Sequence, residues 1–406
     1  MSSSGNHQSD GGDESKQSVI KIDPDGDLTL VVGKTKTRFL VCSKTLSRSA
    51  PFWKRCLYGQ FKEGKPAAEE DWVVEFPEDN PSGLKCLLLL VHGLGHKMPK
   101  INLQLAFEIT VLTNKYGMTR TLWAVAGSWL GDLEPTRPDE GGDDTIVPQL
   151  KWLWVTKELG DSYQHKETFA ELSQVVSTAA GGDAHLLLQP YEMGDADLLT
   201  KGTMEGYDAE KDVLLLLAGE IKVARETALS EIQVVLKKDI KRLRDAIRGF
   251  DSSKGSEGAY ICTQRNSSQQ RLCEYAMQAI VTKISAGKDS AVKPIAKIDE
   301  SVENYLTSAV CFKSRIEREI AFVSSGAHAN CTPFRSRLPS LGFLKTMTLK
   351  TWRLLNAEAF ERQARVSGLE KDSSEDNDDG EDQNAAGLRS AALKRSRDEF
   401  EAAASD

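Results

Sequence analysis

The fold of this chain is decided by residues 25–53, which read DGDLTLVVGKTKTRFLVCSKTLSRSAPFW. Two runs of aliphatic and β-branched residues, 28–32 and 37–41, flank a short polar connection that contains Gly33, and this pattern predicts a β-hairpin. Ser43 is suited to cap a short helix that reaches Arg48. Pro51 fits the first turn of a second helix, which Gly59 ends. The stretch therefore predicts a small sheet followed closely by helices.

The same mixture of strands and helices continues downstream. A third strand is predicted at 72–76. The leucine-rich run 84–91 fits a buried strand or a buried helix by periodicity alone, but Ser82 as a cap and His92 with Gly93 as a stop favour a helix. Apolar residues at helical spacing then predict two more helices, at 103–116 and 119–130. We expect one α+β domain to cover residues 19–131.

A linker and a mostly α-helical region follow. Residues 132–147 are rich in proline, glycine and acidic side chains, a composition typical of a domain boundary. Residues 148–366 are predicted to be helical, and their clearest feature is an aliphatic stripe with steps of three and four residues. The stripe consists of Leu229, Ile232, Leu236, Ile240, Leu243 and Ile247. The other helices are expected at 152–159, 167–176, 269–284, 302–323 and 341–360.

Both ends of the chain have the composition of disordered segments. Residues 1–18 contain almost no apolar side chain that could offset the entropy of ordering. Residues 367–406 are first acidic and then rich in alanine, and we predict a disordered tail there. Lys394, Arg395 and Arg397 form a small basic cluster in this tail, and it is a candidate nuclear-import signal.

Composition and charge exclude several classes of protein. The 406 residues suit two to three domains, and the longest apolar runs are far shorter than the roughly 20 residues of a membrane-spanning helix. The first residues show no secretory signal, so we expect a cytoplasmic or nuclear protein. The net charge of −8 opposes bulk attraction to DNA or to an anionic membrane. We therefore expect no membrane partner and consider a nucleic-acid partner unfavoured.

The residues at 25–53 and beyond resemble the opening of a BTB/POZ domain. The resemblance begins with the hairpin DGDLTLVVG and FLVCSKTL, and includes SAPFW at 49–53 and Phe61-Lys62-Glu63. It extends through the helix end LLLLVHG, Met98-Pro99 and LTNKY at 112–116, and so covers residues 20–131. The helical remainder, with WLWVTKELGD at 152–161, is similar to fungal proteins in which a divergent BTB domain precedes an uncharacterised helical region.

The resemblance implies a small sheet flanked by helices that binds proteins, often as a homodimer or on a cullin scaffold, and performs no catalysis. In cullin-binding relatives a hydrophobic-x-Glu element follows the helix opened here by Pro51, and Phe61 and Glu63 stand at the matching place. A carboxylate beside an exposed aromatic side chain could anchor a partner. Two interpretations stay open: Phe61 and Glu63 contact a cullin, or Phe61 packs inward and Glu63 is solvated.

The seven cysteines are scattered and include no C-x2-C pair, so we expect reduced, mostly buried thiols and no disulfide framework. Folding could bring together His328, Cys331, Cys262 and Cys273, and thiolate with imidazole is zinc chemistry. Because no two of these residues form a C-x2-C pair or a similarly close pair of ligands, the preferred interpretation is that the cysteines pack in the core. The prediction is therefore no metal and no cofactor.

Other motifs carry weaker signals. Gly33-Lys34-Thr35 lacks the first glycine of a phosphate-binding loop and is interpreted as a hairpin turn. His92 and His96 have the spacing of a helical metal pair, but the glycines around them end the helix. The residues 23–34 do not place glycine and glutamate as a calcium loop requires.

No motif supports an enzyme, and the chain has neither a G-x-S-x-G elbow nor an H-E-x-x-H helix. A basic helix could contact phosphates, although acidic residues alternate with its basic ones and indicate a solvated face. Its basic residues are Lys237, Lys238, Lys241, Arg242, Arg244 and Arg248. The leading hypothesis is a non-enzymatic protein-interaction module that oligomerises with itself or with another protein. The alternatives are a substrate adaptor of a cullin-based ubiquitin ligase and a nuclear regulator with weak nucleic-acid contact.

Overall fold

The structure is a computed structural model that describes residues 18–66, 71–137, 146–178, 186–188, 206–248, 262, 267–286, 291–295, 298–323, 331 and 336–367. It forms two compact units, of which the first comprises Met1–Ala124 with Tyr207–Glu210 and the second comprises Val125–Gly206 with Lys211–Asp406. Residues 1–17 of the arm expected at 1–18 and residues 368–406 of the tail expected at 367–406 lie outside the described residues, as does the basic cluster Lys394, Arg395 and Arg397. Ser367, the first residue of the expected tail, is the last residue of a helix.

The first unit contains a four-stranded sheet in the order β1-β3-β2-β4. Its strands are β1 (Ile20–Lys21), β2 (Leu28–Val32), β3 (Thr37–Val41) and β4 (Val73–Phe76). The pair β2 and β3 is antiparallel, with Leu30 opposite Phe39, while β4 runs parallel to β2 and β1 parallel to β3. Gly33 has φ +72° in the connecting turn, a conformation that glycine adopts without strain. The predicted hairpin is confirmed.

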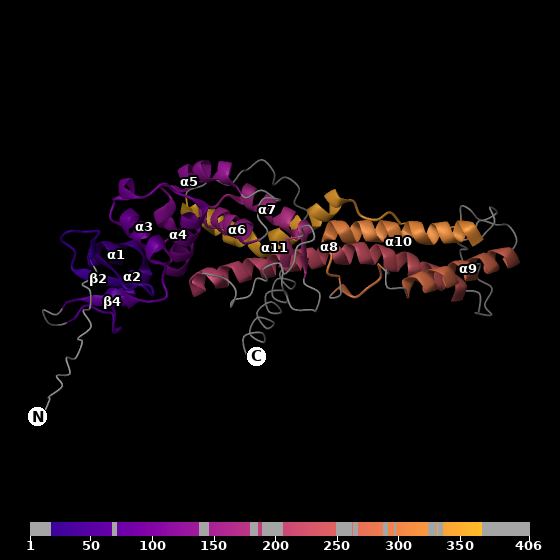
Figure 1. Cartoon of the computed structure of the whole chain (residues 1–406), viewed down its shortest axis with the longest axis horizontal. Helices are drawn as coiled ribbons and strands as arrows, with labels where there is room; N and C mark the ends of the chain where they lie inside the picture. Colours follow the sequence, from indigo (N-terminus) through magenta and orange to yellow (C-terminus); the bar gives the residue numbers. More distant parts are fainter. Residues whose placement is uncertain are drawn as a thin grey trace, which may run out of the picture. The chain divides into compact units, whose positions relative to one another are not determined.

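Four helices, α1 to α4, lie next to this sheet in the first unit, as Figure 1 shows. They are α1 (Ser43–Ser49), α2 (Pro51–Tyr58), α3 (Pro81–Val91) and α4 (Leu103–Tyr116), with 3-10 turns η1 (Gly95–Lys97) and η2 (Thr119–Leu122). The ambiguous run at 84–91 is a helix, and it ends at His92 as expected. The coarse prediction of a mixed α+β fold with a small sheet is confirmed.

Two predicted helix caps are wrong. Asn80, not Ser82, caps α3, because the helix already begins at Pro81. The side-chain oxygen of Asn80 accepts a hydrogen bond from the backbone N–H of Ser82 at 2.9 Å. Ser43 is not the cap of α1, because it is the first residue of the helix and Cys42 occupies the N-cap position. The N–H of Ser43 is instead satisfied by Asp27 Oδ1, a distant residue in the sequence, at 2.8 Å.

The core of the first unit lies between the sheet and these helices. Trp53 of α2 is fully buried and its ring packs against Phe76 and Tyr116 with centroids 5.3 Å and 4.9 Å away. Its indole N–H points to Met118 Sδ at 3.0 Å. Leucines of α3 and inward residues of β2 complete this core. Burial of so many large side chains is the main stabilising contribution to the unit.

The second unit is almost entirely helical in its described part. It contains α5 (Ala126–Leu133), η3 (Glu134–Thr136), α6 (Val147–Leu159), α7 (Ser162–Val175), α9 (Ser267–Ser285), α10 (Val302–Val323), α11 (Leu341–Ser367) and most of α8 (Asp208–Arg248). A short antiparallel pair, β5 (Val176–Thr178) with β6 (Leu186–Leu188), was not expected. Among the described residues, no helix is long and apolar enough to cross a lipid bilayer.

The junction between the two parts differs from the expectation. The helix predicted at 119–130 is interrupted: η2 ends at Leu122 and α5 begins at Ala126, and the two units meet between them in sequence. Residues 132–136 at the start of the expected linker belong to α5 and η3, and Leu133 among them is buried in spite of its acidic neighbours. Residues 138–145, the centre of that linker, lie outside the described part.

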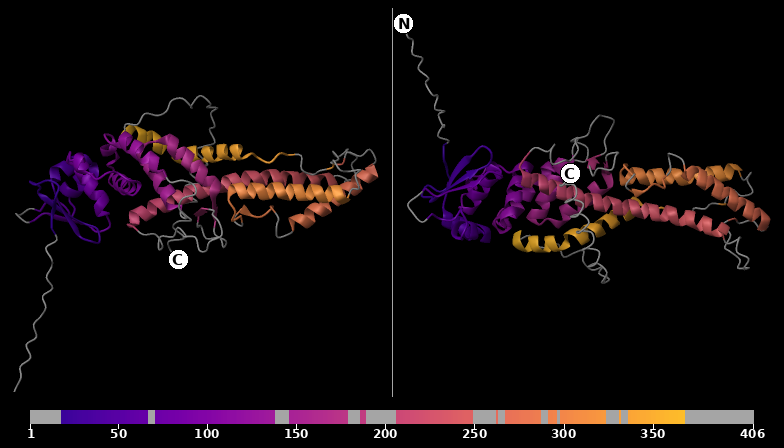
Figure 2. Two further views of the ribbon diagram at one scale, coloured as in Figure 1. Left: turned by 45° about the horizontal axis from the view of Figure 1, so that its top comes forward. Right: turned by 90° about the horizontal axis from the view of Figure 1, so that it is seen from below.

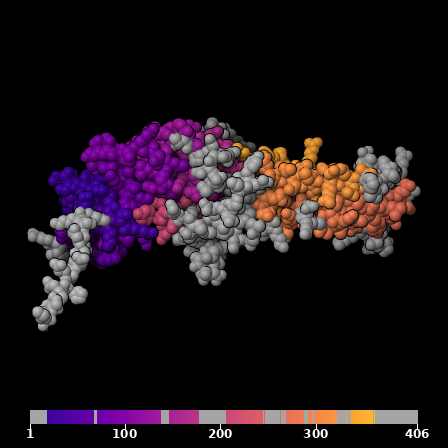
Figure 3. All heavy atoms as spheres, viewed as in Figure 1, coloured from indigo at the N-terminus to yellow at the C-terminus, as the bar shows by residue number. Residues whose placement is uncertain are grey.

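Helix α8 lies alongside α9 and α10 in both Figure 1 and Figure 2. Five members of the predicted stripe, Leu229, Ile232, Leu236, Ile240 and Leu243, are buried in one core with apolar residues of α9 and α10. In the space-filling view of Figure 3, the atoms of α10 (orange) lie along one face of this unit. The amphipathic prediction for this helix is thus confirmed, and the second unit has a hydrophobic core of its own.

Arg225 of α8 is a fully buried cation that joins separate segments of the second unit. Its Nε donates to the carbonyl of Val176 at 3.1 Å, and its Nη2 donates to the carbonyls of Ile298, at 2.7 Å, and Glu300. Burial lowers the pKa of Arg225, whereas the acidic side chains nearby oppose that shift. The guanidinium thereby satisfies carbonyls that would otherwise be costly to bury.

Candidate functional site

The loop that follows α2 presents the two predicted contact residues, Phe61 and Glu63. Its backbone is fixed at several points: the indole N–H of Trp72 donates to the carbonyl of Glu63 at 2.9 Å, and the N–H of Lys65 donates to the carbonyl of Leu57 at 3.1 Å. A further turn bond joins the N–H of Gly64 to the carbonyl of Phe61 at 3.0 Å. The loop is therefore held against α2 and the start of β4.

The side chain of Phe61 is largely open to solvent. Its side chain is 61% exposed, which is high for a phenylalanine, so the interpretation that it packs inward is wrong. Tyr58, three residues earlier, is 45% exposed. We call these two side chains the aromatic surface of the first unit. Exposed aromatic side chains on fixed backbone are typical of protein-binding surfaces.

Glu63 lies beside this surface but is only partly open to solvent. Its side chain is 27% exposed, and its carboxylate is 3.7 Å from the ammonium of Lys62, which is almost fully exposed. Such a pair is weak in water, so a partner cation could displace Lys62 at little cost. The structure thus places an exposed aromatic ring and an acidic group on one short loop.

A polar network supports Tyr58 from behind. The tyrosine hydroxyl and the Ser43 hydroxyl are 2.6 Å apart, and Ser43 donates both its N–H and its O–H to the carboxylate of Asp27 at 2.8 Å and 2.7 Å. Burial raises the pKa of Asp27, but the hydrogen bonds from Ser43 outweigh it and leave the pKa below its usual value. The charged network holds Tyr58 while its ring edge contacts Trp72, with centroids 5.8 Å apart.

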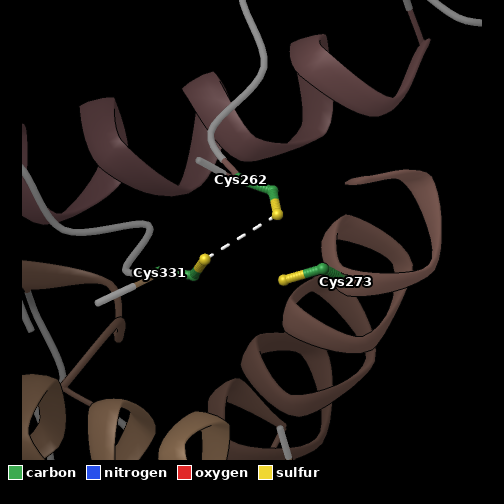
Figure 4. A group of neighbouring side chains, drawn as sticks. All are labelled: Cys262, Cys273 and Cys331. Atoms are coloured by element: carbon green, nitrogen blue, oxygen red, sulfur yellow. Dashed lines mark hydrogen bonds between the residues drawn. The ribbon is translucent and has the colours of Figure 1, made fainter. Parts of the chain in front are cut away.

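A second candidate site lies in the second unit, where three cysteines converge. Cys273 belongs to α9, while Cys262 precedes that helix and Cys331 follows α10, and all three are buried. Their sulfur atoms all lie within 4.8 Å of one another. The sulfurs of Cys331 and Cys262 are 3.8 Å apart, and Figure 4 shows the three side chains directed toward one common point. We call this group the thiol triad.

Helix α9 positions two members of the triad. It carries Cys273 itself, and its buried Glu274 accepts a hydrogen bond from the backbone N–H of Cys262 at 3.1 Å. Gln270, one turn earlier, donates to the carbonyl of Cys262 at 3.5 Å. Burial raises the pKa of Cys273 strongly, and the neighbouring Cys331 and Cys262 raise it further. His328, the fourth residue of the zinc-type combination in the sequence, lies outside the described residues.

The remaining sequence candidates occupy structural positions. His92 ends α3, where its Nε2 accepts from the N–H of Cys42 at 3.2 Å and its Nδ1 lies 2.8 Å from the carbonyl of Leu88. The ring is thus held by backbone groups, while His96 belongs to η1 and is exposed. Gly33 to Thr35 form the hairpin turn and not a loop before a helix. Neither motif forms the site that its sequence pattern suggests.

The basic helix is part of α8, and its lysines at 237, 238 and 241 are exposed. Lys237 donates to Gln233 at 2.7 Å. Asp239, however, does not alternate with the lysines on the outer face, because it is buried and accepts from the hydroxyl and the N–H of Ser336 at 3.0 Å and 3.2 Å. The side chains of Arg244 and Arg248 lie outside the described part.

Two buried polar groups were not singled out by sequence. Asp79, after β4, accepts from Lys115 Nζ at 2.7 Å and from the hydroxyl of Tyr116. His165 of α7 is fully buried among aromatic rings. The first group gives Lys115 and Tyr116, the last two residues of α4, a common partner, since both side chains donate to the same carboxylate. Neither group lies on the aromatic surface or in the thiol triad.

Comparison with known proteins adds no identification, since no protein-family model, no curated protein and no solved structure matches this chain. The two sites above therefore rest on the geometry of this chain alone.

Proposed function

We propose that this chain is a non-enzymatic interaction protein whose first unit is a BTB-like module that pairs with itself or with a partner protein. The observation that carries the proposal is the 61% exposure of Phe61 on a loop whose backbone is hydrogen-bonded to α2 and β4. The α+β architecture of this unit agrees with the resemblance in its sequence.

The aromatic surface suits protein recognition on energetic grounds. Aromatic side chains at the centre of an interface contribute most of the binding energy, and Phe61 and Tyr58 would each lose exposed apolar area. Because hydrogen bonds already fix the backbone of this loop, binding a partner would cost little additional backbone entropy. The polar rim would come from Glu63 and Lys62, which flank the ring.

The oligomeric part of this proposal is tested with the purified full chain by sedimentation equilibrium over a wide concentration range. We expect a species with twice the mass of one chain. Phe61→Asp would shift the association at least tenfold to higher concentration if this surface takes part. A protein that remains monomeric at every concentration and captures no partner would overturn the proposal.

A second candidate function is that of a substrate adaptor for a cullin-based ubiquitin ligase. It is favoured specifically by the pair of an exposed Phe61 and a partly buried Glu63, two positions apart on the fixed loop. Direct binding of a purified cullin to the full chain tests it, with Phe61→Ala and Glu63→Ala each expected to weaken binding at least tenfold. Absence of wild-type binding would contradict this candidate without affecting self-association.

A further inference from the structure

The thiol triad differs from ordinary buried cysteines in its convergence. Cys262 and Cys331 are 69 residues apart in sequence, and each lies outside any helix or strand, yet their sulfurs meet that of Cys273 in the core of the second unit. A single buried thiol is common and packs as a small apolar group. Three thiols that face one point from three segments are the donor arrangement of a soft metal ion.

The distances distinguish a metal site from a disulfide. Two thiolates bound to one tetrahedral Zn²⁺ at about 2.3 Å have sulfurs about 3.8 Å apart. The sulfurs of Cys262 and Cys331 are 3.8 Å apart, and the third sulfur lies within 4.8 Å of both. A disulfide instead needs an S–S distance of about 2.05 Å and would leave one thiol over. The sulfur–sulfur distances in the triad are thus close to those around a zinc ion and much longer than the bond of a disulfide.

We propose that Cys262, Cys273 and Cys331 supply three of the four ligands of one Zn²⁺ ion. The three thiols bind as thiolates, so three S–H bonds break, three Zn–S bonds form, and the three protons leave to solvent. The ion joins the segment before α9, α9 itself and the segment after α10. Its role is structural: it closes the end of the bundle formed by α8, α9 and α10 and is independent of the aromatic surface.

Surrounding groups support this assignment. Glu274 accepts from the N–H of Cys262, and Gln270 donates to the carbonyl of Cys262. Both residues belong to α9, which also carries Cys273, so these two bonds fix the backbone of Cys262 relative to Cys273. Such outer contacts are usual around metal ligands, which they orient.

The test begins with the full chain purified in a reductant that does not bind metal. After incubation with zinc and removal of the excess by gel filtration, elemental analysis should find one zinc per chain. Each of Cys262→Ser, Cys273→Ser and Cys331→Ser should weaken zinc binding at least tenfold. The matched controls are Cys311→Ser, at an exposed position of α10, and Cys86→Ser, at a buried position in the first unit, and both should bind zinc as the wild type does.

A second measurement on the unmodified chain covers the case in which a serine variant does not fold. Titration with Co²⁺ should give a thiolate-to-cobalt charge-transfer band and the strong visible bands of a tetrahedral ion. Zinc should also protect the three triad cysteines, but not Cys311, from alkylation followed by mass spectrometry. No retained zinc together with no cobalt bands, a Cys262–Cys331 disulfide in the reduced preparation, or unchanged zinc binding in folded Cys273→Ser would each overturn the proposal.

Discussion

Tyr116 is held by a carboxylate that is itself almost completely buried. Its hydroxyl donates to Asp79, which Lys115 also contacts at 2.7 Å, and its ring packs on Phe52 with centroids 4.7 Å apart. Burial raises the pKa of Tyr116, and the charge of Asp79 raises it further, so the phenol remains a donor at any ordinary pH. The aromatic ring and the hydrogen bond thus fix the end of α4 together.

Tyr116→Phe is predicted to destabilise the first unit. The variant keeps the ring but removes a donor to a buried carboxylate, which costs about 1.5–3 kcal/mol. Urea unfolding followed by tryptophan fluorescence measures the change. Tyr163→Phe, at an exposed position of α7, is the matched control and should leave the transition in place. Equal midpoints for Tyr116→Phe and the wild type would contradict this explanation of the Lys-Tyr pair.

His165 is a neutral side chain inside the second unit. Its Nδ1 lies 2.8 Å from the carbonyl of Leu153, which makes Nδ1 the protonated nitrogen, and its ring lies near Phe360 and Trp352 with centroids 4.7 Å and 5.9 Å away. Burial lowers the pKa of His165 well below its usual value, and Lys157 lowers it further. The folded chain therefore keeps this ring uncharged.

This burial predicts a loss of stability in acid. Below a pH of about 6.5 the unfolded chain binds a proton at His165 that the folded chain does not bind, so the free energy of unfolding falls as pH falls. The loss is at most about 1.4 kcal/mol for each pH unit. His165→Phe should flatten the decline between pH 7 and pH 5 in urea unfolding followed by circular dichroism. His96→Gln, at an exposed site, should retain it, and identical profiles for His165→Phe and the wild type would refute the prediction.

At the scale of elements, α8 depends on one buried cation. Arg225 donates to carbonyls of β5 and of the segment before α10, so its removal leaves several buried acceptors without their donor. We predict that Arg225→Leu lowers the stability of the second unit by at least about 3 kcal/mol. Arg225→Lys should recover only part of this, because an ammonium cannot reproduce the geometry of the guanidinium. Thermal unfolding measures both, and a fully stable Arg225→Leu variant would contradict the assignment.

Elements with clear end signals could be predicted from sequence. The bounds of α4 and α10 coincide with the predicted ranges, because Asn102 and Ser301 accept from the N–H groups of Leu105 and Asn304 and Gly117 ends α4 with φ +65°. The wrong cap at Ser43 has a tertiary counterpart, since Asp27 accepts from the first N–H group of α1 from 16 residues away. A local sequence pattern does not show contacts between distant residues, so the contact between Asp27 and Ser43 could not be predicted.

At the scale of the whole molecule, the two sites could be predicted to different degrees. The sequence identified Phe61 and Glu63, but their pattern left open whether the ring faces inward, because the loop between Gly59 and Gly64 has no periodicity. The sequence also identified the cysteines of the triad but favoured core packing. Their convergence depends on how α8, α9 and α10 pack, which no short spacing reveals.

If zinc binds the triad, chelation should destabilise the second unit. An ion that binds only the folded chain adds about 2.7 kcal/mol when its free concentration is 100 times the dissociation constant. A chelator should therefore lower the melting temperature of the helical signal in circular dichroism. The same treatment should not change the melting of Cys273→Ser, and an equal shift in that variant would show that the chelator acts elsewhere.

The most direct test of the central claim is affinity capture of the full chain from its native cells, with the captured proteins identified by mass spectrometry. The comparison includes the Phe61→Ala, Glu63→Ala double variant and Phe343→Ala, which changes an exposed phenylalanine of α11. We predict that specific partners of the wild type are retained by Phe343→Ala and reduced at least tenfold in the double variant. An unchanged set of partners in the double variant would contradict the claim that the first unit binds proteins through its aromatic surface.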